Sequence, residues 1–411
     1  MNYVIIGNST AAIAAIEGIR SIDKQGRITL ISIENHHTYS RPLISYLLQG
    51  KTDFDKMKYR PDSFYEDNSV TVVLGKKAVK VIPDMKAVIL EDSSSYEYDR
   101  LLIATGSLPF VPDISGLDKV KSMHTFMTLD DALELEKSIN DKSNVLVLGA
   151  GLIGLKCCEA IKDKVASVTV IDLAKQVLPS ILDKTSSDIV AQHIEKQGVK
   201  LKLSCSIKQV YENSALLTDD SVVRFDALVM AVGVRPNISL LRAAGVDTNR
   251  GVLINQCCAT SIEDIYCAGD CAEGYDMTAD CKKILALLPN AYMQGFCAGV
   301  NMAGEEKIYL SGMPMNALSL MGLHILTAGI YEGEEYVFQD KKGYKRLFYK
   351  DDMLKGFILV DDIECAGIYT AMIRNKTLLS SMDFDLIKKK PALCALAQER
   401  RTSLLNRKET W

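Results

Sequence analysis

The sequence predicts an α/β fold in three parts, in which two similar β-α-β units are followed by a smaller α+β domain. An apolar strand, a glycine-containing turn and a helix occur in that order twice, first from Asn2 and again from Val145. A further apolar strand follows each unit and ends in a similar way, as LLIATG at 101–106 and LVMAVG at 228–233. These repeated patterns indicate a duplicated architecture.

The first unit spans Asn2 to Ile33 and ends at Glu34. Its apolar periodicity predicts a strand, a turn, a helix and a second strand, in that order, at 3–6, 7–10, 11–22 and 27–33. The second unit repeats this order. Its strands lie at 145–148 and 168–172, and between them come the turn Gly149-Ala150-Gly151 and a helix that contains Cys157, Cys158 and Ala160.

The pattern changes after Gly304, where turn residues separate strands at 344–349 and 353–360 and a helix follows at 368–373. We therefore expect a third, α+β domain. The expected division of the chain is a discontinuous first unit at 1–111 and 238–307, a second unit at 112–237, the α+β domain at 308–385 and a basic tail at 386–411.

Composition excludes several classes of protein. The chain is 48% hydrophobic and 24% charged, which is typical of a globular protein, and its formal net charge of -4 argues against nucleic-acid binding. Met1 leads directly into a strand without a basic leader, and the most apolar later stretch, 313–330, is interrupted by polar residues. We expect no secretory signal, no membrane span and a cytoplasmic location.

Cysteine and histidine spacing predicts no metal site. The eleven cysteines are an odd number without a CxxC pair, and the five histidines show no HxxH or HExxH spacing. A cluster of Cys257, Cys258, Cys267 and Cys271 is conceivable by number alone. Packing as small apolar side chains is the interpretation that we favour.

The second β-α-β unit carries a complete dinucleotide-binding pattern. Gly149, Gly151 and Gly154 form GxGxxG, and Asp172 lies at the end of the following strand. Such glycines permit a sharp turn and close approach of a pyrophosphate to a helix N-terminus, and the acid binds ribose hydroxyls. Asp172 would repel a 2'-phosphate, so the pattern favours NADH over NADPH, although Lys175 is near.

The first unit carries a weaker version of this pattern. Gly7, Ser9 and Ala12 occupy the three glycine positions, and Glu34 stands where the ribose contact is required. An ordinary strand-to-helix turn is the alternative. The presence of the second pattern in the same chain argues against that alternative.

These motifs together resemble those of the FAD-dependent pyridine nucleotide-disulfide oxidoreductases, over about residues 1–380. The resemblance is closest to NADH:rubredoxin reductases and to the flavin module of assimilatory nitrite reductases. The segments that carry it are VIIGNSTAA, YSRPLIS (39–45), LLIATGS, VLVLGAGLIG, VMAVGVRPN, IYCAGDCAE (265–273) and AGIYT (366–370).

The resemblance implies two Rossmann-like dinucleotide-binding domains with FAD and NADH as cofactors. The residues expected to bind FAD are Gly7, Ser9, Ala12, Glu34, Arg41, Pro42, Thr105, Gly106, Gly269, Asp270, Asn290 and Gln294. Those expected to bind NADH are Gly149, Gly151, Ile153, Gly154, Asp172 and Gly233.

A helix is expected to begin after Pro289, and its N-terminal dipole would stabilise an anionic reduced flavin ring. The tryptophan that the family usually has just before this helix is Leu287 here.

The redox cysteines of the family are missing. Related disulfide reductases, oxidases and peroxidases carry one or two cysteines soon after the ribose-binding acid, whereas no cysteine lies between Glu34 and Gly50. Thr10 replaces the histidine that peroxidases have in the first turn. Electrons are therefore expected to leave FAD directly for an external acceptor, and single-electron carriers fit best.

Two further residues are candidates for a catalytic role. Many relatives have a glutamate that pairs with a lysine near the flavin; here Lys156 stands at the glutamate position and Tyr46 at that of the lysine. We expect the Lys156 cation to approach the flavin from the opposite wall. The alternative is that Lys156 points to solvent or pairs with Glu159 on its own helix.

The predicted function is transfer of electrons from NADH through FAD to rubredoxin or a ferredoxin-type iron-sulfur protein. An NADH oxidase that uses oxygen and a redox-regulated flavoprotein scaffold are the alternatives, and a homo-oligomer is possible. The basic tail would either dock an acidic carrier or pack as an amphipathic helix. Its basic residues are Lys388, Lys389, Lys390, Arg400, Arg401, Arg407 and Lys408.

Overall fold

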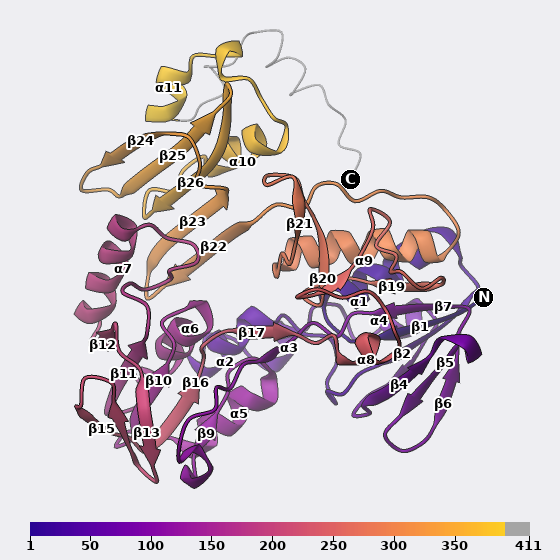
Figure 1. Ribbon diagram of the computed structural model, residues 1–411, viewed down its shortest axis with the longest axis horizontal. Coiled ribbons are helices and arrows are strands. Elements are labelled where there is room, and N and C mark those ends of the chain that lie inside the picture. The colour runs from indigo at the N-terminus through magenta and orange to yellow at the C-terminus, as the bar shows by residue number, and fades with distance from the viewer. Residues whose placement is uncertain (391–411) are drawn as a thin grey trace.

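The computed structural model describes residues 1–390 and arranges them in three sheet-based units (Figure 1). Each of the first two units is built on a five-stranded parallel sheet. The first has the order β19-β7-β1-β2-β3, and the second has the order β12-β11-β10-β16-β9. The strands of the first sheet are β1 (Asn2–Ile6), β2 (Arg27–Ile31), β3 (Val70–Val73), β7 (Arg100–Ile103) and β19 (Ile265–Cys267). Those of the second are β9 (Met123–His124), β10 (Asn144–Leu148), β11 (Ser167–Asp172), β12 (Lys200–Leu203) and β16 (Ala227–Met230).

The duplication predicted from the sequence is confirmed by the strand register. Ile5 of β1 pairs with Leu30 on one side and Leu102 on the other, and Val147 occupies the same central position in β10. These side chains are fully buried. Strands covered on both faces are expected to be apolar throughout, which explains why both sheets have Val, Ile and Leu runs.

The strand predicted at 27–33 is shorter than expected. It ends at Ile31. Ser32 still donates its N–H to the Val73 carbonyl oxygen, but the next residue, Ile33, turns outward and is 64% exposed. Apolar character alone therefore extended the predicted strand by two residues.

Two helices pack tightly in the first unit, α1 (Thr10–Ile22) and α9 (Leu288–Met302), as Figure 1 shows. A Cβ on Gly295 would lie 2.0 Å from the Ala11 carbonyl oxygen, and one on Gly299 would lie 2.2 Å from that of Ala15. Only glycine permits this approach. The packing brings the N-terminus of α9 beside that of α1. The helix α6 (Leu152–Ile161) occupies the place of α1 in the second unit.

The C-terminal unit is an antiparallel sheet of order β22-β23-β26-β25-β24, covered by α10 (Ala366–Arg374) and α11 (Phe384–Lys389). This confirms the α+β character predicted for this part of the chain. Its strands are β22 (Met315–Leu320), β23 (Leu323–Gly329), β24 (Glu334–Gln339), β25 (Tyr344–Lys350) and β26 (Met353–Val360). Of the tail predicted at 386–411, residues 391–411 lie outside the described residues.

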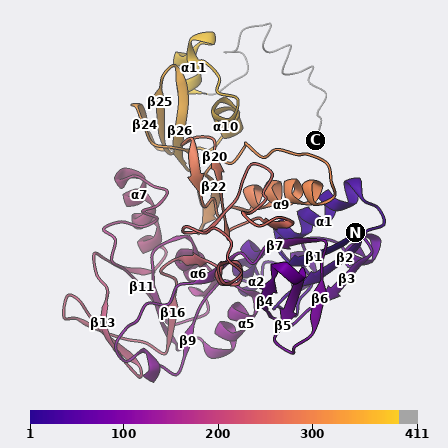
Figure 2. The same ribbon diagram turned by 45° about the vertical axis from the view of Figure 1, so that its right-hand side comes forward.

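The C-terminal unit rests on the second unit, as Figure 2 also shows. At the turn between β22 and β23, the N–H of Met321 donates to Glu159 of α6 at 2.7 Å, and its carbonyl oxygen lies 3.0 Å from His193 Nε2 of α7 (Lys184–Lys196). Asp183, the N-cap of α7, accepts from Tyr344 at 2.7 Å and Arg346 at 2.6 Å. Polar contacts from the β22-β23 turn and from β25 thus hold the second unit against the C-terminal sheet.

Smaller elements connect these units. The strands β8 (Ser107–Pro109) and β17 (Val234–Pro236) pair where the chain passes between the first two units, and β18 (Val252–Leu253), β20 (Ala272–Asp276) and β21 (Cys281–Lys283) form a ribbon beside α9. Two three-stranded sheets flank the units, made of β4 (Ala78–Ile82), β5 (Ala87–Leu90) and β6 (Ser95–Glu97), and of β13 (Ile207–Tyr211), β14 (Ser214–Leu217) and β15 (Val222–Arg224). The remaining helices are α2 (Ile44–Leu48), α3 (Phe54–Met57), α4 (Phe64–Asp67), α5 (Leu129–Ser138) and α8 (Ser239–Ala243).

Among residues 1–390, no helix has the length and apolar character needed to cross a membrane.

Candidate dinucleotide-binding sites

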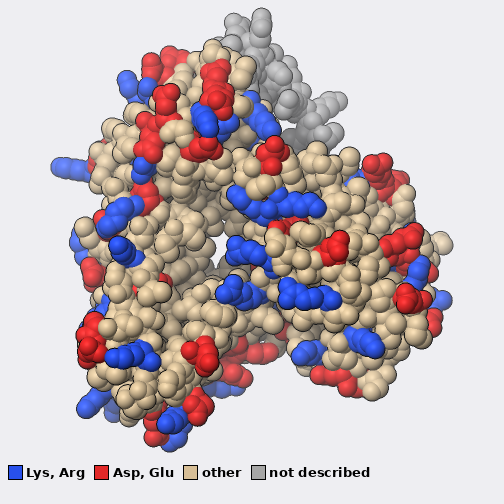
Figure 3. Space-filling model, in the orientation of Figure 1, with Lys and Arg blue, Asp and Glu red and all other residues tan. Residues whose placement is uncertain are grey.

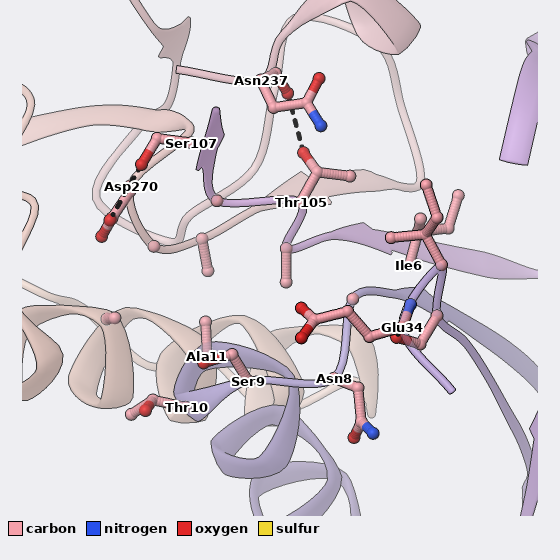
Figure 4. Close-up of a pocket in the computed structure, with 18 of the residues that line it drawn as sticks. Ile6, Asn8, Ser9, Thr10, Ala11, Glu34, Thr105, Ser107, Asn237 and Asp270 are labelled. Carbon is pink, nitrogen blue, oxygen red and sulfur yellow. Dashed lines mark hydrogen bonds between the residues drawn. The ribbon is translucent and has the colours of Figure 1, made fainter. Parts of the chain in front are cut away.

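The main pocket lies at the carboxyl ends of β1, β2 and β7 (Figure 4). This is where parallel α/β sheets bind ligands, because loops from neighbouring strands converge there. Of the residues predicted to bind FAD, those that line this pocket are Gly7, Ser9, Glu34, Arg41, Thr105, Gly106, Gly269 and Asp270. Leu288 and Ala291, from the first turn of α9, lie at the same wall.

The glycine turns of the two units have the same geometry. Gly7 and Gly149 have φ values of +124° and +117°, and a Cβ on either would lie 2.2 Å from a carbonyl oxygen, that of Ala104 or Ala231. A Cβ on Gly154 would lie 2.0 Å from the Gly149 carbonyl oxygen. The sequence pattern therefore identified positions where a side chain is sterically excluded.

Each turn presents an uncapped helix N-terminus. Ser9 is the N-cap of α1 and Gly151 that of α6, and neither helix receives a side-chain cap. A Cβ on Gly151 would meet no atom within 4 Å, so this side of the turn is open. Backbone N–H groups of a first helical turn without partners suit a phosphate.

Glu34 is held at the rim of the first pocket by two neighbours. Its carboxylate accepts a hydrogen bond from Tyr39 at 2.6 Å and forms an ion pair with Arg41. The Tyr39 hydroxyl also accepts the N–H of Leu129 at 2.9 Å. These contacts fix an acidic acceptor beside the Gly7 turn, where a ribose is expected.

Asp270 lies at the opposite end of this pocket, and Ser107 donates to it at 3.3 Å (Figure 4). Burial raises the pKa of Asp270, while the Ser107 hydrogen bond and the Arg41 charge act in the opposite direction. Thr105 donates to the Asn237 carbonyl oxygen at 2.8 Å and so ties the end of β7 to the returning chain. Ser107 and Asn237 were not predicted as site residues, although they are the last residues of the LLIATGS and VMAVGVRPN motifs.

The other residues predicted for FAD lie behind the pocket. Gln294 accepts the N–H of Gly269 at 2.9 Å, and Asn290 donates to the Met313 carbonyl oxygen at 3.0 Å. Neither these two residues nor Ala12 and Pro42 line the pocket. Gln294 instead shapes the Gly269–Asp270 turn from behind.

In the second unit, Asp172 closes the end of β11 against the glycine turn. Its carboxylate accepts the N–H of Ala150 at 2.6 Å and that of Ala174 at 2.7 Å. Gly233, with a φ of +109°, follows β16, which lies on the other side of β10, and a Cβ there would meet no atom within 4 Å. The turn, the acid and the open edge reproduce the geometry of a second dinucleotide site.

Lys156 and Tyr46 come together, but neither lines the main pocket. Lys156 forms an ion pair with Glu159, donates to the Ser319 carbonyl oxygen at 3.2 Å and lies over the Tyr46 ring. The pair with Glu159 on the same helix is the alternative that the sequence offers for Lys156.

Cysteines near the pocket are buried within the first unit. The sulfur atoms of Cys267 and Cys271, on either side of Asp270, are 3.5 Å apart. Burial raises the pKa of the Cys267 thiol well above its usual value. In the described part of the chain, no three His, Cys, Asp or Glu side chains are grouped as metal ligands.

Family models match most of the chain. Residues 1–295 match the model of pyridine nucleotide-disulphide oxidoreductases, and residues 314–377 match the rubredoxin NAD⁺ reductase C-terminal domain. The chain belongs to the pyridine nucleotide-disulphide oxidoreductase family. It is an FAD-dependent NADH oxidoreductase, and FAD and NADH are its cofactors.

Individual relatives agree with this assignment. The epsilon subunit of the NADH-dependent phenylglyoxylate dehydrogenase of Aromatoleum evansii is 32% identical over 92% of this chain and 93% of its own length. The Bacillus subtilis nitrite reductase is 30% identical over 98% of this chain but only 50% of its own length, and the NADH-rubredoxin oxidoreductase of Clostridium acetobutylicum is 26% identical over 95% and 97%. The crystal structure of a ferredoxin reductase from Rhodopseudomonas palustris has a TM-score of 0.86 at 24% identity, covering 95% of this chain and all of that one, which confirms the fold.

Proposed function

We propose that this family member passes electrons from NADH through FAD to an iron-sulfur protein that carries one electron at a time. In the overall reaction, NADH loses a hydride and two oxidised carriers each gain one electron. The products are NAD⁺, one proton and two reduced carriers. The observation that carries this proposal is a complete pair of dinucleotide sites without a cysteine between Glu34 and Gly50 to accept electrons from the flavin.

The first pocket would hold FAD. The Gly7 turn and the N-terminus of α1 would receive its pyrophosphate, Glu34 its ribose, and Asp270 the chain that leads to the ring. When bound, FAD supplies the conversion of a two-electron hydride into single electrons. The N-terminus of α9 reaches the same pocket through Leu288 and Ala291, where its dipole favours negative charge.

The second site would hold NADH. The glycine turn leaves room for a pyrophosphate, and the Asp172 carboxylate would accept hydrogen bonds from ribose hydroxyls. That carboxylate would repel a 2'-phosphate. We therefore propose NADH rather than NADPH as the preferred donor.

Named activities of the relatives support a protein acceptor. They include NADH-rubredoxin oxidoreductase and a subunit of an NADH-dependent dehydrogenase, both matched over almost their full length. A model of a rubredoxin reductase C-terminal domain also matches the third unit. We propose a small iron-sulfur protein as the partner and a cytoplasmic location, to which the free state of all described cysteines lends support.

An anaerobic stoichiometric assay tests this function. Purified flavin-loaded protein with a limiting amount of NADH is expected to reduce two equivalents of oxidised rubredoxin, followed by absorbance. Faster NADH consumption with oxygen than with rubredoxin would favour the oxidase. If NADH bleaches the flavin but no acceptor is reduced, the result would favour a redox-regulated flavoprotein scaffold.

A further inference from the structure

A groove of basic character adjoins the main pocket. Arg250, Lys282 and Lys283 line it, and all three are exposed. We call this surface the basic groove. Figure 3 shows Lys and Arg side chains gathered beside the central hollow, over the region where β17, β20 and β21 lie in Figure 1.

The basic groove shares a wall with the pocket proposed for FAD. Ser107 and Asp270 line both cavities, and the hydrogen bond between them forms part of that wall. A protein seated in the groove would therefore lie directly beside the flavin pocket, and neither Asp172 nor the Gly149 turn lines the groove. This separation matters because both electron donor and electron acceptor must reach one flavin.

The charges of the groove have few partners within the chain. In the portion described by the structure, Arg250 and Lys282 form no ion pair, and Lys283 lies 3.7 Å from the buried Asp276. Two acids line the groove as well. Asp270 accepts the Ser107 hydroxyl at 3.3 Å, and Glu273 accepts the N–H of Gly251 at 3.0 Å and the side-chain amide of Asn249 at 3.1 Å. Grouped cations repel one another, and an acidic partner relieves that repulsion.

Apolar residues line the groove together with the charged ones. They are Val234 and Pro236 of β17 and, just after β21, Ile284 and Ala286. Arg235, between the first two, instead stacks on Phe110 at 4.6 Å. Apolar residues beside polar and charged ones are the usual composition of a protein interface, whereas a site for a small anion needs no apolar residues.

We propose that the basic groove docks the acidic face of the iron-sulfur carrier and so places its redox centre beside the flavin. This inference rests on the proposed function. The whole chain has a formal net charge of -4, so the groove is a local exception that steers an acidic partner to one place. The chemistry of the groove selects for negative charge together with an apolar contact.

Charge reversal in the groove tests this proposal. The test variant is Arg250→Glu/Lys282→Glu, and the matched control is Lys142→Glu/Lys200→Glu, two exposed lysines of the second unit that change the net charge equally. Two acceptors are compared anaerobically, an acidic rubredoxin and menadione, a small uncharged quinone that needs no docking surface. The milder variant Arg250→Gln/Lys282→Gln guards against a folding defect.

The groove variant is expected to lower kcat/KM for rubredoxin at least tenfold at low ionic strength and to flatten its salt dependence. The Gln variant should show a smaller loss, and the control should stay within twofold of the wild type. Menadione reduction and the KM for NADH should not change in any variant. If the groove variant reduces rubredoxin as fast as the control variant, or has a raised KM for NADH, the docking inference is overturned but the proposed function is not. Failure of the wild type to reduce rubredoxin would overturn the proposed function and, with it, the inference.

Discussion

The Lys156 ammonium nitrogen lies 4.6 Å from the centre of the Tyr46 ring. Tyr46 belongs to the segment that follows Arg41, Lys156 belongs to α6 of the second unit, and its third partner, Ser319, belongs to the C-terminal sheet. One side chain thus contacts all three units. Its ion pair with Glu159, which also accepts the N–H of Met321, fixes the junction from the side of α6.

Replacing Lys156 by Met is expected to slow flavin reduction by NADH about 3- to 10-fold, with no loss of bound flavin. The loss of a cation-π contact of about 1 kcal/mol, and of the ion pair that neutralises the buried Glu159, would let the second unit shift relative to the flavin pocket. Stopped-flow absorbance measures the rate, and Lys156→Arg should restore most of it. If Lys156→Met reduces its flavin at the wild-type rate, the Lys156 contacts join the three units without affecting hydride transfer from NADH.

Asp172→Ala is expected to raise the KM for NADH about 10- to 100-fold while leaving flavin content unchanged, since the two cradles lie in different units. The change removes a charged acceptor, worth about 1.5–3 kcal/mol, from the ribose and frees the Ala150 N–H. Steady-state kinetics with menadione and the absorbance ratio at 450 and 280 nm provide the two readouts. Equal loss of NADH affinity and flavin would contradict the assignment of separate sites.

Asp270→Asn is expected to stabilise the apoprotein and at the same time to weaken FAD binding. Burial raises the pKa of the carboxyl, so the folded apoprotein holds this proton more tightly than the unfolded chain. The resulting stabilisation is present below the unfolded pKa of about 3.9 and is lost as the pH rises through the folded pKa.

At pH 7, the Asn variant should therefore have a higher free energy of unfolding as apoprotein, measured in urea, yet bind FAD about 10- to 100-fold more weakly because a charge-assisted acceptor is lost. The gain in stability over the wild type should shrink as the pH is lowered toward 4. FAD affinity equal to that of the wild type would exclude Asp270 from the site.

The redox role of cysteine is open to direct chemical test. Among the described cysteines, Cys281 and Cys365 are exposed, and Cys267 and Cys271 are buried. Iodoacetamide should modify the exposed pair in the native protein and leave the rate of flavin reduction by NADH within twofold. A long-wavelength absorbance band that disappears on alkylation would instead show a thiolate beside the flavin.

The duplicated units could be predicted from the sequence because their constraints are local. Gly7 and Gly149 each occupy a turn in which a Cβ would strike a carbonyl oxygen, so steric exclusion leaves a readable pattern. The acids Glu34 and Asp172 follow at the end of the next strand for the same local reason.

The remaining features depend on contacts between distant segments. Met321, with a φ of +51°, joins the C-terminal sheet to Glu159, which is 162 positions away in sequence. The basic groove likewise combines Arg250 with Lys282, and no periodicity in either segment indicates that they share a surface. Long-range packing, rather than local propensity, decides both.

Anaerobic double-mixing stopped flow tests the central claim most directly. Flavin-loaded protein pretreated with iodoacetamide is first mixed with one equivalent of NADH and then with oxidised rubredoxin. The flavin absorbance should bleach fully and then recover, as rubredoxin is reduced, at least as fast as steady-state turnover of the same alkylated protein. Bleaching that is abolished by iodoacetamide, or recovery slower than turnover, would contradict direct transfer from flavin to carrier.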